Sequence, residues 1–306
     1  MFDSSTLISW LHHVAVAVRA VADSNFVTAV VGSLAGAFGG AWAAQRIAES
    51  SKLREELVKE IRNTNAAASM LYGIANAHLG LKQQFVKPMH DAYFDGLNRH
   101  TLFERAIEAG TVPPQQRFDI KFDLQSLKPP YSPTEAIQQL MFNQISLTGA
   151  APFVAQVLFS SIQSLNELLL DRNRLVEDWK SNRPTDLLQA YLGLPQQSSV
   201  DNRYKSCMEG MYLQTDNVIA FSTMVADALF EHGKSQRVRL RKRFHIDGPL
   251  LHKFDFSRFE EFLPPPEEFN NFAKMFEADK RLPVTKQALH RRLWRKLRRA
   301  QIPEGG

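Results

Sequence analysis

An uncharged stretch of 19 residues, Phe26–Ala44, constrains this 306-residue chain more than any other feature. A helix rises about 1.5 Å per residue, so a helix of this length covers the roughly 30 Å of hydrocarbon in a bilayer. Trp42 lies near one end, where an amphipathic ring favours the membrane interface. We therefore expect a transmembrane helix over residues 26–45. The rival interpretation is a glycine- and alanine-rich helix buried inside a soluble protein.

The glycines of this stretch predict that it packs against another helix. Gly32, Gly36 and Gly40 recur at every fourth position, so they share one side of a helix. Small residues let the backbones of two membrane helices approach closely. We expect either self-association of the chain or packing against a partner transmembrane helix. Bulky residues recur with the same period and form a ridge: Phe26, Val30, Leu34, Phe38 and Trp42.

Basic residues near the stretch predict its orientation. Arg19 lies before it, whereas five follow closely: Arg46, Lys52, Arg54, Lys59 and Arg62. Lys and Arg accumulate on the cytoplasmic side of a membrane, so the C-terminal domain is expected in the cytoplasm. A Gly/Ala-rich span that leads directly into a charged helix is similar to bacterial single-pass anchors, over about forty residues. That resemblance implies a bacterial inner membrane and carries no activity with it.

The N-terminal segment, residues 1–25, contains a second apolar stretch at 7–22, interrupted by His12, His13 and Arg19. We interpret it as an amphipathic helix that lies on the outer membrane surface. The rival is a short second span, which would return the N-terminus to the cytoplasm. A cleaved signal peptide is disfavoured, because no basic residues precede the apolar run.

Residues 46–236 are expected to form a cytoplasmic helical bundle. Apolar residues recur there at helical spacing, and Gly and Pro interrupt the pattern. The fold class is therefore mainly α: a single N-terminal transmembrane helix, then a helical-bundle domain with at most a minor β element. The expected helices cover 47–84, 88–109, 132–146, 152–179 and 201–231, with one short helix within 183–200.

Two segments leave their local structure open. Residues 117–124 (RFDIKFDL) alternate apolar and polar side chains, which predicts a short strand or an extended segment. Residues 237–243 (RVRLRKR) either extend the preceding helix or form a strand. As a strand they would pair with 117–124, so that Asp119 and Asp123 face the arginines. Residues 237–280 are expected to be a Phe-rich extension that packs on the bundle, with a helix at 267–279.

The basic tail, residues 281–306, has three competing interpretations. Its cations are expected to contact anionic lipid, because each is worth about 1 kcal/mol near an inner leaflet. Nucleic-acid phosphate is a less favoured ligand, and a solvated basic end is the structural alternative. The contact residues we expect are Arg291, Arg292, Trp294, Arg295, Lys296, Arg298 and Arg299.

Sequence motifs assign no chemistry to the chain. It has no phosphate-binding glycine loop, no HExxH motif and no GxSxG motif. The single cysteine, Cys207, excludes an internal disulfide and fits a small buried residue. His245, Asp247, His252 and Asp255 form a weak metal-like cluster, for which a polar loop before an aromatic stretch is the alternative. His90, Asp91 and Asp95 form another weak cluster. We expect no metal, no cofactor and no catalytic residue.

Three functions follow from these observations. We expect a non-enzymatic, membrane-anchored protein of interaction, scaffold or sensor type that self-associates through the span. The first alternative is a membrane-perturbing, pore-forming effector in defence or toxicity. The second is a membrane-tethered enzyme or nucleic-acid-binding protein with an unrecognised site. The partners we expect for this chain are the lipid bilayer, a second copy of the chain or a partner transmembrane helix, and anionic lipid at the basic tail.

Overall fold

The computed structural model describes residues 15–16, 25–196 and 199–281, without the side chains of 25–31, 196, 199 and 279–281. It divides the chain into two compact units, 1–59 and 60–306. Helix α2, Asn25–Leu81, contributes to both units. Of the expected N-terminal amphipathic segment, Ala15 and Val16 are described, and both are helical and exposed. The rest of that segment lies outside the described residues.

In the first unit, α2 carries large apolar side chains that are open to the surroundings. The exposed fractions are 52% for Leu34, 74% for Phe38, 62% for Trp42 and 71% for Ile47. Four-residue spacing places Leu34, Phe38 and Trp42 in one row. The guanidinium carbon of Arg46 lies 4.7 Å from the centre of the Trp42 ring, one turn away. The charged part of α2 therefore begins directly where its apolar part ends.

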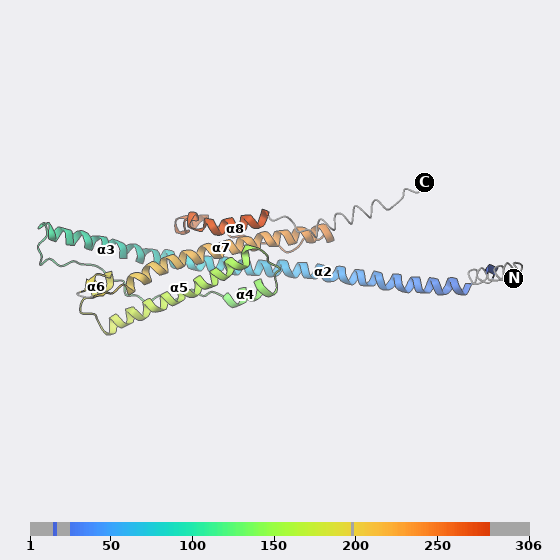
Figure 1. Ribbon diagram of the computed structural model, residues 1–306, viewed down its shortest axis with the longest axis horizontal. Coiled ribbons are helices and arrows are strands. Elements are labelled where there is room, and N and C mark those ends of the chain that lie inside the picture. The colour runs from blue at the N-terminus through green and yellow to red at the C-terminus, as the bar shows by residue number, and fades with distance from the viewer. Residues whose placement is uncertain (1–14, 17–24, 197–198, 282–306) are drawn as a thin grey trace, which may run out of the picture. The chain divides into compact units, whose positions relative to one another are not determined.

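The second unit is a bundle of helices, which confirms the mainly α, helical-bundle part of the predicted fold class (Figure 1). After α2 the chain continues through a π-helical turn, η1 (Lys82–Val86), into α3 (Lys87–Glu108). A two-residue antiparallel pair, β1 (Pro195–Gln196) and β2 (Ser199–Val200), is the minor β element among the described residues. The remaining elements are α4 (Thr134–Asn143), α5 (Ala150–Ser181), α6 (Leu187–Leu192), α7 (Arg203–Phe244), η2 (Ser257–Phe262), η3 (Pro266–Phe269) and α8 (Asn270–Arg281).

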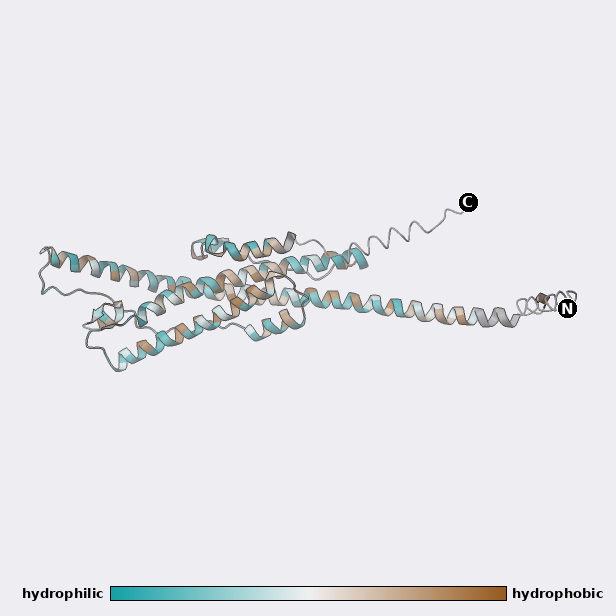
Figure 2. Ribbon diagram, viewed as in Figure 1, coloured by the Kyte–Doolittle hydropathy of each residue, from teal (hydrophilic) through white to brown (hydrophobic). Residues whose placement is uncertain are grey.

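The core of the bundle centres on α5 and α7, which run in opposite directions side by side (Figure 1). Figure 2 shows apolar residues gathered where these helices meet. Each fully buried Leu or Val stabilises the fold by roughly 1.5–3 kcal/mol relative to exposure, so this interface contributes strongly to stability. Its buried side chains include Leu158, Ile162, Leu165 and Leu169 of α5, and Val218, Ile219, Val225 and Leu229 of α7.

Among the described residues, one helix is long and apolar enough to cross a membrane by length and composition, and that helix is α5. Its apolar face, however, is buried against its neighbours in the bundle, with Leu158, Leu165 and Leu169 fully covered. Burial explains its hydropathy without a membrane. The expected span at 26–45 begins among residues whose side chains are not described, so its placement in a membrane stays a prediction.

Of the two alternatives for residues 237–243, the extension of the preceding helix is confirmed, and the strand that would pair with 117–124 is wrong. Residues 237–243 belong to α7, and the segment 117–124 has no regular secondary structure. The buried guanidinium of Arg172 holds the end of this segment instead. Its Nη1 donates to the backbone carbonyl oxygen of Gln125 at 2.6 Å, and its Nη2 donates to that of Asp123 at 3.1 Å. A helix also suits 237–243 better, since Leu240 alone turns into the core while the charged residues around it turn outward.

The chain after α7 returns along the bundle. Helix α7 ends at His245, whose φ of 57° is left-handed and stops the helix. Phe269 is then buried, and its ring lies 5.4 Å from the ring of Phe221 on α7. Phe272 of α8 lies 4.8 Å from the same ring. Aromatic contacts therefore hold η3 and α8 on the outer side of α7.

Candidate functional site

The glycines predicted to pack in the membrane lie on the exposed part of α2. Apart from the backbone of α2 itself, a Cβ atom built on Gly32, Gly36 or Gly40 meets no atom of the described residues within 4 Å. Nothing in the described fold therefore requires glycine at these positions. The surface that these three glycines form is free to contact another molecule. Such a contact is the role that the sequence predicts.

The predicted lipid-contact residues of the tail lie outside the described residues. This applies to Arg291, Arg292, Trp294, Arg295, Lys296, Arg298 and Arg299. Their interpretation as an anionic-surface contact stays a prediction from the sequence.

The weak metal-like clusters do not assemble in the described part of the chain, where no group of three His, Cys, Asp or Glu side chains is placed to hold a metal ion. The carboxylate of Asp255 accepts hydrogen bonds from the backbone N–H and hydroxyl of Ser257 at 2.9 and 3.0 Å. Asp91 accepts from Lys87 Nζ at 2.7 Å. Both carboxylates have local structural partners.

The most unusual polar contact in the bundle is a buried ion pair that the sequence did not predict. Lys82 Nζ lies 2.5 Å from Asp216 Oδ1, and both side chains are almost fully buried. Lys82 opens the π-helical turn between α2 and α3, and Asp216 lies on α7. A π-helical turn adds a residue to the helical repeat and shifts the side chains that follow, and such turns are frequent at functional sites.

Aromatic rings and further acidic groups surround this pair. Lys82 Nζ lies 4.9 Å from the centre of the Tyr212 ring, and the imidazole of His90 stacks on that ring at 4.2 Å. A pocket of about 270 Å³ adjoins the pair, with Glu209 and Glu268 in its wall. Burial raises the pKa of Asp216, and the nearby Glu268 adds to this, although the hydrogen bond and the charge of Lys82 oppose it.

The chemistry open to this cluster is electrostatic. The ammonium of Lys82 pairs with the carboxylate of Asp216, and the imidazole of His90 stacks on the ring of Tyr212. These residues therefore do not form the nucleophile–base–acid arrangement of a covalent catalyst. A buried ion pair with one partner missing is strongly destabilising. The pair therefore fixes how α7 is aligned against the junction of α2 and α3.

A second polar cluster joins three elements around Glu60. Its Oε1 accepts hydrogen bonds from His232 Nε2 at 2.9 Å and from the Ser146 backbone N–H at 3.1 Å, and it also accepts from the Ser146 hydroxyl. Burial acts to raise the pKa of Glu60, but the hydrogen bonds from Ser146 and His232 outweigh it and lower the pKa. The carboxylate stands between the serine and the histidine, so the imidazole is not placed to activate the hydroxyl.

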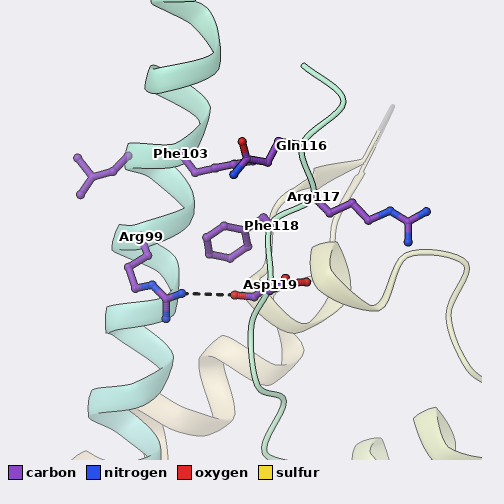
Figure 3. Close-up of a pocket in the computed structure, with 7 residues that line it drawn as sticks. Arg99, Phe103, Gln116, Arg117, Phe118 and Asp119 are labelled. Atoms are coloured by element: carbon purple, nitrogen blue, oxygen red, sulfur yellow. Dashed lines mark hydrogen bonds between the residues drawn. The ribbon is translucent and has the colours of Figure 1, made fainter. Parts of the chain in front are cut away.

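A surface pocket of about 440 Å³ lies between α3 and the segment after it (Figure 3). Figure 3 shows Phe103 and Phe118 on its apolar side and the guanidinium of Arg99 directed at Asp119. Arg99 Nη2 donates to the backbone carbonyl of Asp119 at 3.4 Å. The contact holds segment 116–119 against α3, and the pocket brings together no acid–base pair.

No protein-family model, curated protein or solved structure matches this chain.

Proposed function

We propose that this chain is a single-pass membrane protein whose helical bundle is a non-enzymatic interaction domain on the cytoplasmic side. The observation that carries the proposal is the uncovered apolar surface of α2. Leu34, Phe38 and Trp42 are more than half exposed on a stretch without a charge. Leaving such a surface in water is costly, at about 25 cal/mol per Å² of apolar area, and a bilayer removes that cost.

The junction with the charged part of α2 supports a membrane boundary near Trp42. An indole ring with a guanidinium stacked on it, as Arg46 is on Trp42, suits the interface between hydrocarbon and headgroups. The excess of Lys and Arg after this point supports a cytoplasmic bundle.

The proposal assigns no reaction, because the polar clusters of the bundle join structural elements to one another. Lys82 holds Asp216, Arg172 holds backbone carbonyls, and Glu60 holds His232 and Ser146. We propose instead that the chain self-associates through the open row of Gly32, Gly36 and Gly40. This row lets two helices approach closely without a clash from their own side chains.

Two measurements on the full-length chain test the proposal. Sodium carbonate extraction of membranes is expected to leave the chain in the lipid fraction, and its release would refute the anchor. In those membranes, Gly36→Ile is expected to reduce crosslinked dimer to a small fraction of the wild-type yield. The matched control is Ala41→Ile, which adds the same side chain roughly 140° around the helix. Equal crosslinking of all three forms would refute self-association through this row.

A further inference from the structure

We propose that the basic end of α7, residues 237–243, is a second membrane contact that takes the headgroups of anionic phospholipids. The proposal rests on the membrane anchor proposed above. This end carries Arg237, Arg239, Arg241, Lys242 and Arg243, with no Asp or Glu among them. Figure 2 shows the end of α7 as hydrophilic.

Most of these cations are not used by the fold. Arg239, Arg241, Lys242 and Arg243 are exposed, and Leu240 is the one residue of 237–243 that is fully buried. Within the described residues, the ion pair at this end of α7 joins Arg241 Nε to Asp247 Oδ1 at 3.7 Å, and both side chains are largely exposed. A surface pair of this kind holds its partners weakly. The end of α7 therefore keeps a strong net positive charge.

The helix dipole explains only part of this charge. Cations in the last turn of a helix are favoured by its dipole, and Arg241, Lys242 and Arg243 lie in that turn. The effect decays within one turn, so it does not account for Arg237 and Arg239. Val238, which is 51% exposed, lies between these arginines. Arginines that alternate with an exposed apolar side chain suit the boundary between headgroups and acyl chains.

The position of this end in the bundle favours a membrane over other polyanions. Gln236 Nε2 lies 3.4 Å from Glu60 Oε1, and a Cβ on Gly248 would lie 3.2 Å from Ile61 and 3.4 Å from Arg237. The basic end of α7 thus lies beside residues 60–61. These residues follow Ala44, the last residue of the proposed span, by about 16 positions, so the chain itself keeps this end close to the bilayer. Each cation near an anionic leaflet strengthens such a contact about fivefold.

The experiment places a fluorophore at the proposed contact in the full-length chain. Val238→Cys, in a Cys207→Ser background, is labelled with an environment-sensitive dye, and the chain is reconstituted into vesicles that contain a headgroup-linked nitroxide quencher. The vesicles are of phosphatidylcholine, with or without phosphatidylglycerol. We expect strong quenching that requires phosphatidylglycerol and is relieved by high salt.

Charge variants then identify the cations responsible. Arg239→Gln, Lys242→Gln and Arg243→Gln combined are expected to weaken the contact about 100-fold, as three losses of about fivefold each. The matched control combines Lys121→Gln, Lys128→Gln and Arg183→Gln, which removes the same charge from exposed positions elsewhere in the bundle and is expected to change nothing. Neutralising Arg291, Arg292 and Arg295 separates the contribution of the tail.

Three outcomes would overturn the proposal. They are equal quenching with and without phosphatidylglycerol, loss of quenching on neutralising the tail but not α7, and a rise in dye polarisation with duplex DNA but not with anionic vesicles. Carbonate extraction of the same samples tests the anchor separately. A chain that is stripped by carbonate yet still shows quenching dependent on phosphatidylglycerol would refute the anchor and support the contact at α7.

Discussion

Helix α5 and the first part of α2 are both rich in apolar residues, but the structure treats them differently. On α5, Leu158, Leu165 and Leu169 are covered by neighbouring helices of the bundle. On α2, Leu34, Phe38 and Trp42 remain open. Hydropathy alone ranks α5 as a membrane helix, whereas burial shows that its apolar face is already satisfied. An apolar helix needs a membrane or a partner to cover it only where its own fold leaves its apolar side chains exposed.

The largest expected loss of stability comes from breaking the buried ion pair inside the bundle. Lys82→Met leaves Asp216 buried without its partner and is expected to cost about 3–5 kcal/mol in the free energy of unfolding. The matched control is Lys52→Met on the first part of α2, where the pair with Glu56 is exposed and is expected to contribute less than about 1 kcal/mol. Urea unfolding in mild detergent measures both.

A double variant sharpens this result. Lys82→Met combined with Asp216→Leu removes both charges and is expected to recover most of the lost stability. If the single and double variants are equally unstable, the pair is not what aligns α7 with η1.

The same substitution in the two apolar regions gives the next largest contrast. Leu165→Ala removes a fully buried side chain and is expected to cost about 2–5 kcal/mol of bundle stability. Leu34→Ala removes a half-exposed side chain and is expected to leave bundle stability within about 0.5 kcal/mol. Similar losses for both, measured by the same denaturation, would mean that Leu34 also packs against protein.

A smaller contrast concerns polar contacts. Tyr72 Oη donates to Asp227 Oδ1 at 2.6 Å inside the bundle, so Tyr72→Phe is expected to cost about 1 kcal/mol. Gln45 donates to Glu49 at 2.9 Å on the exposed part of α2, and Gln45→Ala is expected to change stability by less than that. The midpoint of thermal unfolding reports both, and a larger shift for Gln45→Ala would reverse the ranking.

The smallest expected effect is a pH dependence confined to the bundle. His78 is fully buried, its Nδ1 lies 2.8 Å from the Ile74 carbonyl oxygen, and burial lowers its pKa. The unfolded chain therefore binds a proton more readily than the folded one. The bundle is therefore expected to keep its full free energy of unfolding at pH 7.5, where His78 is neutral in both states. This free energy is expected to fall as the pH drops below about 6.5 and the unfolded chain takes up the proton.

Unfolding at pH 7.5 and pH 5.5 measures this loss. His78→Leu is expected to flatten the pH dependence, whereas His252→Gln, at an exposed position, is expected to preserve it. An unchanged slope in His78→Leu would assign the dependence to another group.

Local sequence signals predicted the helices well where caps and breakers mark them. The helix expected at 88–109 is α3, Lys87–Glu108, and Gly110 follows it with a left-handed φ of 73°. The helix expected at 152–179 is α5, Ala150–Ser181. The helix expected at 201–231 runs on to Phe244, as one alternative for 237–243 allowed. Gly233 does not end it, because this glycine lets Leu251 and Thr64 pack closely against α7.

The contacts between buried polar residues could not be predicted from the sequence. Lys82 and Asp216 are 134 residues apart, and Glu60 and His232 are 172 apart, so no spacing rule links them. Under the strand alternative, Asp123 would have faced the arginines of 237–243. Its backbone carbonyl instead accepts from Arg172, which lies in the middle of a helix and is not marked by any sequence motif.

Most helices of the bundle and the uncharged stretch of α2 follow from the amino-acid order alone, because these properties depend on neighbours within a few positions along the chain. Which apolar faces are covered and which charges meet depends on how the helices pack. Coverage and pairing depend on distant segments brought together by packing, and the same leucine is stabilising in α5 or an exposed surface on α2 according to what lies against it.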